Sequence, residues 1–192
     1  MKFGIYPNLG KKDLKMALER LTALLRDKNI DYSLPLSMKK GLMDMGFTED
    51  TYETDESMGK RDFILSVGGD GSFLGAARAF RDYPVLMAGL HLGDLGFLNS
   101  MTLRDMEKRV DQILSGDYQE EHRLYLSAAL IHGDGRKEKL PTVLNDVVIG
   151  HASIGQLARI RLFINDSFIQ EYAADGLIIS SPTGSTGYSL SC

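Results

Sequence analysis

The sequence lacks the features that several large protein classes need. Its 192 residues include one cysteine, Cys192, so no disulfide can form within the chain and a reducing compartment is expected. No apolar run approaches the roughly 20 residues of a membrane-spanning helix, and the first residues do not have the pattern of a signal peptide. The formal net charge of -4 provides no basic surface for wrapping nucleic acid. We therefore expect a cytoplasmic protein that binds neither membranes nor nucleic acid.

Several familiar site motifs are also missing. The four histidines, His91, His122, His132 and His151, have no ligand spacing, and no Cys/His metal cluster exists, so we expect no metal-ligating residues and interpret the histidines as structural or surface residues. Neither the GxxxxGK[ST] phosphate loop nor the GxGxxG dinucleotide fingerprint is present. The mechanisms that belong to those two motifs are therefore not expected here.

The hydrophobic pattern changes after Gly116. Before it, short apolar runs alternate with segments of helical periodicity, and Thr102 with Asp105 three residues later predicts the start of a helix that ends near Gly116. After it, only strands are predicted, at 124–131, 143–149, 157–164 and 168–172. Asn165-Asp166 is predicted to form a turn, and 132–135 contains a hairpin signal.

This order of elements predicts two domains. Residues 1–118 are expected to form an α/β domain, Rossmann-like, with a mostly parallel sheet and flanking helices, and residues 119–192 an all-β domain. So few strands would leave the second domain with an open sheet edge and little core. We therefore expect the second domain to be incomplete.

The first glycine-rich stretch, Gly68-Gly69-Asp70-Gly71-Ser72, follows the apolar run Phe63–Val67. Glycine lets backbone N–H groups approach an anionic or sugar-bearing ligand, because no Cβ intervenes. We interpret Gly68, Gly69, Gly71 and Ser72 as a phosphate loop, and Asp70 as a carboxylate that accepts a proton or helps to position Mg²⁺. The alternative is a tight strand-to-helix turn in which Asp70 caps the helix.

The second stretch runs from Asp175-Gly176 through Leu177–Ile179 to 182–188. It places the hydroxyl groups of Thr183, Ser185, Thr186 and Tyr188 around Gly184 and Gly187, while Pro182 restricts the approach and Tyr188 offers a flat ring for stacking. The pattern indicates a binding turn, and the alternative is an exposed turn of small polar residues.

Asn145-Asp146 interrupts a predicted strand. Adjacent side chains of a strand point to opposite faces, so at least one of the two enters an interior or a cleft. An amide and a carboxylate there could recognise base edges or ribose hydroxyls. The alternative is a bulge or strand start held by local side-chain hydrogen bonds.

In this order the motifs resemble those of NAD kinases, which phosphorylate NAD on its adenosine 2′-hydroxyl to give NADP. The matching stretches are 68–72, 93–98, 145–148, 175–180, 181–186 and 188–191. The resemblance implies ATP, or in some members polyphosphate, as phosphoryl donor, Mg²⁺ or another divalent metal as its companion, and a homodimer or homotetramer. A sugar or lipid kinase that shares the Gly-Gly-Asp-Gly loop, and a non-catalytic NAD or NADP sensor, stay open as alternatives.

The resemblance also implies roles for single residues. Asp70 would be the catalytic aspartate that faces the ribose 2′-hydroxyl, Asn145 and Asp146 would contact the adenosine, and Asp175 would reach the nicotinamide end. The implied NAD-binding residues are Asp70, Gly71, Asn145, Asp146, Asp175, Thr183, Ser185, Thr186, Gly187, Tyr188, Ser189, Leu190 and Ser191.

The sequence departs from the family pattern at several positions. His91 stands where the family usually has asparagine in a Gly-x-Asn-x-Gly stretch, Asp94 where a basic or polar residue is common, and Gly187 where alanine is usual. Ala173 replaces a frequent basic residue. The family's chain also continues beyond Ser191, so we expect the second domain to lack its end and residues 1–192 alone to have weak or no activity.

Overall fold

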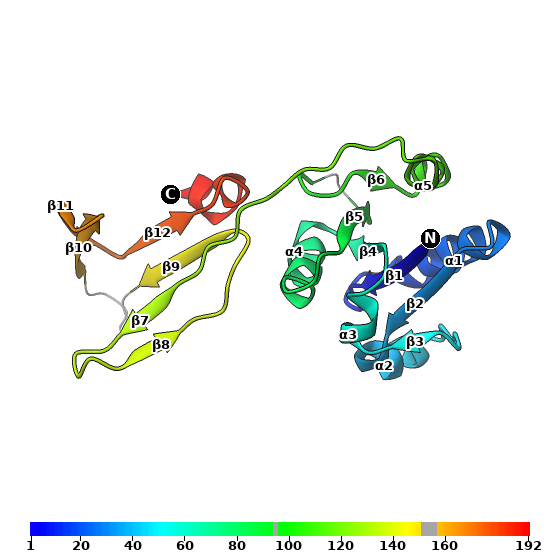
Figure 1. The fold of residues 1–192 in the computed structure, drawn as a ribbon, viewed down its shortest axis with the longest axis horizontal. Helices are drawn as coiled ribbons and strands as arrows, with labels where there is room; N and C mark the ends of the chain where they lie inside the picture. Colours follow the sequence, from blue (N-terminus) through cyan, green and yellow to red (C-terminus); the bar gives the residue numbers. More distant parts are fainter. Residues whose placement is uncertain (94–95, 151–156) are drawn as a thin grey trace. The chain divides into compact units, whose positions relative to one another are not determined.

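The computed structural model describes residues 1–93, 96–150 and 157–192. Asp94 and His151 lie outside the described residues. The chain divides into two compact units, Met1–Glu120 (unit 1) and Glu121–Cys192 (unit 2), drawn from blue to green and from green to red in Figure 1.

Unit 1 is built on a six-stranded sheet in the order β3-β2-β1-β4-β5-β6, and every neighbouring pair is parallel. The strands are β1 (Lys2–Pro7), β2 (Asp31–Pro35), β3 (Tyr52–Glu53), β4 (Phe63–Gly68), β5 (Leu86–His91) and β6 (Met101–Thr102). This is the strand order of the Rossmann fold, in which the direction of winding reverses between β1 and β4. The predicted fold class of this part is confirmed.

Helices cover both faces of this sheet. They are α1 (Leu14–Asp27), α2 (Lys39–Asp44), α3 (Asp55–Met58), α4 (Asp70–Ala79) and α5 (Met106–Ser115), with a 3₁₀ turn at Leu36–Met38. One core joins α1, α2 and α5 to strand residues such as Phe3 and Leu65, and the other joins α3 and α4 to Ile64. Alternate residues of the central strand β4 face opposite sides of the sheet, and helices cover both sides. All six residues of β4 are therefore buried, and its sequence is a nearly continuous apolar run.

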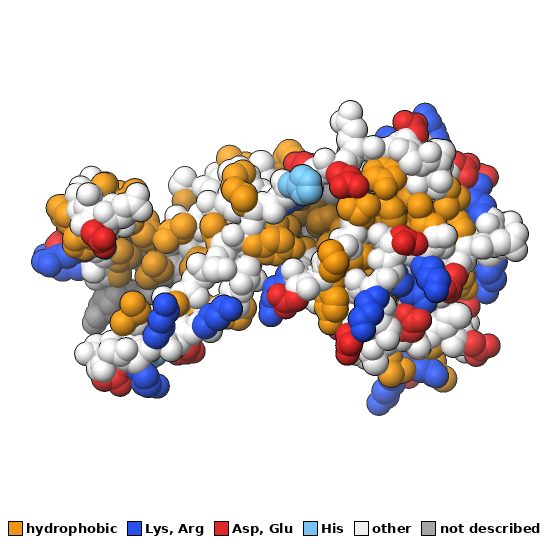
Figure 2. Space-filling view, in the orientation of Figure 1, with side chains coloured by type: hydrophobic (Ala, Val, Ile, Leu, Met, Phe, Trp, Pro, Cys, Tyr) orange, Lys and Arg blue, Asp and Glu red, His pale blue; other side chains and the backbone are white. Residues whose placement is uncertain are grey.

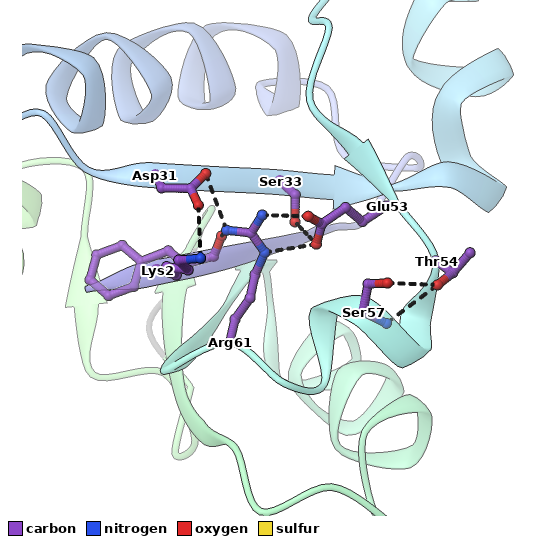
Figure 3. A network of polar contacts seen from close by, with 8 residues as sticks. Lys2, Asp31, Ser33, Glu53, Thr54, Ser57 and Arg61 are labelled. Atoms are coloured by element: carbon purple, nitrogen blue, oxygen red, sulfur yellow. Dashed lines mark hydrogen bonds and ion pairs between the residues drawn. The ribbon is translucent and has the colours of Figure 1, made fainter.

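A polar network ties β1, β2 and β3 to the segment before β4 (Figure 3). The Arg61 side chain is 7% exposed; its guanidinium donates to both carboxylate oxygens of Glu53, at 2.7 and 2.9 Å, and to the Phe3 carbonyl at 3.2 Å. Asp31 lies 3.5 Å from Arg61, and the Ser33 hydroxyl donates to Glu53. The hydrogen bonds from Arg61 lower the pKa of Glu53.

Helix α5 begins later than the sequence predicts. Its N-cap is Asp105, not Thr102, so the predicted start was wrong by three residues. The expected pair still interacts, because Asp105 Oδ1 accepts from both the hydroxyl and the backbone N–H of Thr102, each at 2.6 Å. These hydrogen bonds, led by that of the hydroxyl, with a further one from Arg109, lower the pKa of Asp105 to about 2.

The low pKa of Asp105 predicts a pH dependence of stability. A carboxyl whose folded pKa lies below its usual value of 3.8 stabilises the protein above that value and loses this contribution as the pH falls towards about 2. We expect the free energy of unfolding to fall less steeply between about pH 5 and pH 2 in Asp105→Asn than in the parent. Urea denaturation at several pH values measures this, with Asp44→Asn, an exposed aspartate, as control. Equal slopes in parent and Asp105→Asn would contradict the prediction.

The described residues of unit 2 form three antiparallel strand pairs and two short 3₁₀ helices. The pairs are β7 (Ala129–Ile131) with β8 (Lys137–Lys139), β9 (Asp146–Gly150) with β12 (Gly176–Ser180), and β10 (Ala158–Ile164) with β11 (Ser167–Ala174). Asn165 and Asp166, both with positive φ, connect β10 to β11, so the predicted turn is confirmed. Of the predicted strand 124–131, only Ala129–Ile131 forms a strand.

Most apolar side chains of unit 2 are at its surface (Figure 2). Among its described residues Leu144 is the only buried hydrophobic one, whereas Ile131, Phe163 and Ile169 are each at least half exposed. This burial fits the small core expected for so few strands. No helix in the described part of the chain is long and apolar enough to cross a membrane.

Candidate functional site

The Gly68–Ser72 turn of unit 1 lies where the winding of the sheet reverses. This turn follows β4 and lies next to the turn that follows β1, because the two strands are parallel neighbours. Asn8 joins the two turns: its backbone N–H donates to the Val67 carbonyl at 3.0 Å, and its Nδ2 donates to Ser72 Oγ at 2.9 Å. In open α/β sheets ligands bind at this reversal, outside the carboxyl ends of the strands. The topology therefore marks this turn as a candidate binding site.

The shape of the turn depends on Gly68. Its φ is +155°, and a Cβ there would overlap the Ser72 side chain. Ser72 Oγ accepts from the Gly69 N–H at 3.1 Å and holds the backbone closed at the start of α4. Glycine is required at Gly68 for packing, while at Gly71 a Cβ would meet nothing within 4 Å. Gly71 thus leaves open space beside the first turn of α4.

Asp70 is the first residue of α4, and its carboxylate binds the loop that follows β5. It accepts from the backbone N–H groups of Phe97 at 2.8 Å and Leu98 at 3.1 Å, and from Asn99 Nδ2 at 2.8 Å. A carboxylate offers about four acceptor positions, so one is left for a further donor. The carboxylate therefore holds residues 97–99 and does not cap α4.

Two glycines make room for this arrangement. A Cβ on Gly96 would overlap the Asp70 carboxylate, and a Cβ on Gly89 would overlap the Asn99 side chain. Neither Asn8 nor Asn99 was predicted as a site residue. The signal that could have found them is their place, because both follow strands that flank β4 in the Rossmann order.

Lys11 adds a positive charge to the same turn. A Cβ placed on Gly69 would lie 3.7 Å from Lys11 Nζ, so the ammonium group lies beside the glycine backbone. Within the described ranges no carboxylate lies within 4.0 Å of it. A cation beside the first N–H groups of a helix, which lack intrahelical partners, favours a bound anion.

In unit 2 the structure brings Asn145-Asp146 together with the turn after β12. Asp146 pairs with Ser180 at the end of the β9–β12 ladder. The Ser181 N–H donates to the Asn145 carbonyl at 2.8 Å, and the buried Ser181 hydroxyl donates to the Leu144 carbonyl while it accepts from the Gly184 N–H. A Cβ on Gly184 would overlap the Asn145 backbone, which explains that glycine.

The Asn145 side chain also approaches Gly187. A Cβ on Gly187 would lie 3.2 Å from Asn145 Nδ2 and 3.8 Å from Asp146 Oδ2, so these two side chains and the turn form one cluster. Asn145 Oδ1 is buried and has no hydrogen-bond partner among the described residues. A buried acceptor without a partner calls for an explanation, and a ligand that donates to it would provide one.

The hydroxyl groups of the 182–188 turn already make some hydrogen bonds within the protein. Ser185 Oγ donates to the Pro182 carbonyl at 2.7 Å, Thr186 Oγ1 to the Thr183 carbonyl at 3.4 Å, and Thr183 Oγ1 accepts from Arg123 at 3.2 Å. The oxygens of Ser185 and Thr186 remain free to accept. Sequence reasoning did not find Arg123, because its partner lies 60 residues away in the chain.

A cavity of about 730 Å³ lies along β9 and β12 and is lined by Asp175, Tyr188 and Ser189, together with residues 148–150, 176–178 and 192. It brings these three predicted site residues together. Asp175 precedes Gly176, which pairs with Gly150 at the other end of the ladder from Asp146. Leu190 and Ser191 are exposed and do not line this cavity.

Comparison with protein families finds two matches. Residues 3–118 match the ATP-NAD kinase N-terminal domain, and residues 144–192 match the ATP-NAD kinase C-terminal domain. An NAD kinase from Saccharophagus degradans is 38% identical over 98% of this chain, and one from a Thermoanaerobacter species is 34% identical over 99%. The chain spans 63% and 66% of the lengths of these two curated relatives.

Solved structures show the same fold. A yeast NADH kinase complexed with NADH matches with a TM-score of 0.86 and 21% identity, over 100% of this chain and 60% of its own. An NAD kinase from Archaeoglobus fulgidus in complex with ATP matches with a TM-score of 0.72 and 19% identity, over 100% of this chain and 65% of its own. The family match over residues 3–118 covers more than half of the sequence, and the chain therefore belongs to the NAD kinase family.

Proposed function

We propose that the protein is an NAD kinase that phosphorylates the adenosine 2′-hydroxyl of NAD to give NADP, with ATP or polyphosphate as the donor. The observation that carries the proposal is Asp70, a carboxylate oriented by three hydrogen bonds beside a glycine turn at the reversal point of a Rossmann sheet. The yeast NADH kinase complexed with NADH and the archaeal NAD kinase in complex with ATP support these substrate classes.

Asp70 acts as general base in this proposal. Its remaining acceptor position receives the proton of the ribose hydroxyl, and the hydroxyl oxygen forms a bond to the terminal phosphorus of the donor. The bond between that phosphorus and the bridging oxygen breaks, and ADP leaves when ATP is the donor. The N–H groups of Phe97 and Leu98 keep the carboxylate in one orientation throughout.

The donor phosphates bind at the Gly68–Ser72 turn. The first N–H groups of α4 lack intrahelical partners and the helix dipole favours negative charge there, and Lys11 supplies a full positive charge beside Gly69. A Mg²⁺ carried by ATP would be held by the donor phosphates, because the one acceptor position left on Asp70 receives the ribose proton. When bound, the metal neutralises phosphate charge that builds up during transfer.

The residues of unit 2 bind the dinucleotide. Asn145 and Asp146 recognise the adenosine, since a buried amide oxygen without a partner and a neighbouring carboxylate suit amino and hydroxyl donors. Asp175 contacts the nicotinamide end, and Tyr188 and Ser189 line the same cavity. In this proposal the dinucleotide also contacts the rest of the turn, at Thr183, Ser185, Thr186, Gly187, Leu190 and Ser191. We further propose a homodimer or homotetramer in the cytoplasm, where a chain with one cysteine stays reduced.

The proposal is tested by incubating the protein with NAD, ATP and Mg²⁺ and measuring NADP with an NADP-specific dehydrogenase. Formation of NADP supports the kinase. Residues 1–192 alone are expected to have weak or no activity, so binding of NAD without formation of NADP favours a sensor only if it persists after residues 1–192 are joined to the remaining part of a curated relative's chain. Phosphorylation of a sugar or lipid in parallel assays favours the other kinase class.

A matched pair of variants in α4 tests whether a ligand approaches the turn. A methyl group at Gly71 or Gly75 would meet no protein atom within 4 Å. In Gly71→Ala we expect the KM for ATP to rise about tenfold, because the methyl group occupies space that the donor needs. In Gly75→Ala we expect unchanged NADP formation and a gain of about 0.5–1 kcal/mol in stability from helix propensity. An unchanged KM in Gly71→Ala would place the phosphates elsewhere.

A further inference from the structure

We propose that His91, through Asn99, is a positioning residue that holds the Asp70 carboxylate in its working orientation. The effect on turnover rests on the proposed function, while the effect on the loop at 97–99 does not. His91 ends β5, and Asn99 lies in the loop that leads to β6. The side chains form a chain of contacts from the sheet to the carboxylate.

The contacts are close and buried. Asn99 Nδ2 donates to Asp70 Oδ1 at 2.8 Å and lies 3.5 Å from His91 Nδ1. His91 is 7% exposed and Asn99 is 6% exposed, so water does not replace either contact. The amide nitrogen carries two hydrogens, which serve one contact each. One face of Asn99 packs at Gly89, where a Cβ would overlap its side chain.

Hydrogen-bond chemistry selects a single state of this pair. An Asn99 amide turned by 180° would set its oxygen against the Asp70 carboxylate, and two acceptors repel each other. The amide nitrogen therefore faces Asp70 and His91, so His91 Nδ1 must be the acceptor and the ring proton must be on Nε2. If the His91 proton were on Nδ1, this N–H would face the Asn99 amide N–H, and the repulsion would move Asn99 away from the Asp70 carboxylate.

The pair is costly for the fold, which favours a functional role. His91 Nε2 and Asn99 Oδ1 are both buried and have no hydrogen-bond partner among the described residues. Buried polar groups without partners lower stability, and hydrophobic residues at these places would avoid that loss. What the pair provides is a third hydrogen bond to Asp70 with a defined direction. An asparagine side chain at position 91 would also offer an acceptor.

The test compares His91→Asn, which keeps an acceptor, with His91→Leu, which removes it. In His91→Leu we expect kcat for NADP formation to fall about tenfold while the KM for ATP changes less than about twofold, because only the orientation of Asp70 is affected. In His91→Asn we expect kcat within about threefold of the parent. His122→Leu, at an exposed histidine, is the matched control. Equal losses in both His91 variants, or no loss in His91→Leu, would overturn the proposal.

A second readout does not depend on activity. Amide hydrogen exchange of Phe97 and Leu98, whose N–H groups donate to Asp70, is expected to speed up about tenfold in His91→Leu and to stay near the parent rate in His91→Asn. Unchanged exchange in His91→Leu would overturn the positioning role even in a protein without turnover. If the parent, joined to the remaining part of a curated relative's chain, makes no NADP while exchange responds as expected, the kinase proposal fails and the positioning role stands.

Discussion

Replacement of Asp70 with asparagine is expected to lower kcat for NADP formation by about 10²–10⁴-fold, the usual contribution of a general base. The amide has nearly the shape of the carboxylate but takes up a proton poorly. It also has one acceptor oxygen, whereas three donors, from Phe97, Leu98 and Asn99, converge on the two oxygens of Asp70. One amide N–H would therefore face another N–H group. NADP formation and NAD binding, measured on the same preparation, give the result.

The same experiment separates chemistry from loop anchoring. If Asp70 serves only to hold residues 97–99, Asp70→Asn should change amide exchange at Phe97 and leave kcat within about tenfold of the parent. Asp62→Asn is a suitable control, because that carboxylate accepts a backbone N–H from Lys2 and lies outside the proposed site. A small loss of kcat in Asp70→Asn would remove Asp70 as the base.

Replacement of Arg61 with methionine is expected to lower the free energy of unfolding by about 2–4 kcal/mol. Arg61 is nearly buried, and its loss leaves the Glu53 carboxylate without its bidentate partner and removes the hydrogen bond to the Phe3 carbonyl (Figure 3). This loss of stability is near the lower end of the range found when a buried ion pair is broken, because the Glu53 side chain is 34% exposed and water can reach it. Urea denaturation followed by circular dichroism measures the loss.

A double variant tests the cause. If the unpaired carboxylate is responsible, Arg61→Met with Glu53→Gln should be more stable than Arg61→Met alone, because the uncompensated charge is gone. At a pH below the usual carboxyl range the two should converge. Arg61→Met lacks the hydrogen bonds that lower the pKa of Glu53 in the parent, so Glu53 is protonated there and carries no charge. Additive losses in the double variant at neutral pH would show that packing of the Arg61 side chain dominates.

Local patterns in the sequence were sufficient to predict the strand and the turn that carry Asp70. The continuous apolar run of β4 predicts a strand buried on both faces, and the glycines after it predict a turn that exposes backbone N–H groups. The same holds for Asn165-Asp166, because a two-residue turn with positive φ favours those residue types. The start of α5 was predicted too early because the Asp105 carboxylate binds back to Thr102, so residues 102–105 form a turn before the helix.

By itself the sequence indicated the strands β4 and β10, the glycine turn that follows β4, and the place of Asp70 in that turn. Only the tertiary structure decided what Asp70 contacts: Phe97, Leu98 and Asn99 lie 27–29 residues further along the chain. They reach it because parallel strands place the loops at their carboxyl ends along one edge of the sheet. Likewise the strand pairing of β9 with β12 decides that Asn145 lies against the turn at Gly187. Propensity acts over a few neighbouring residues, whereas these contacts depend on strand order and register, which form only when the whole sheet packs.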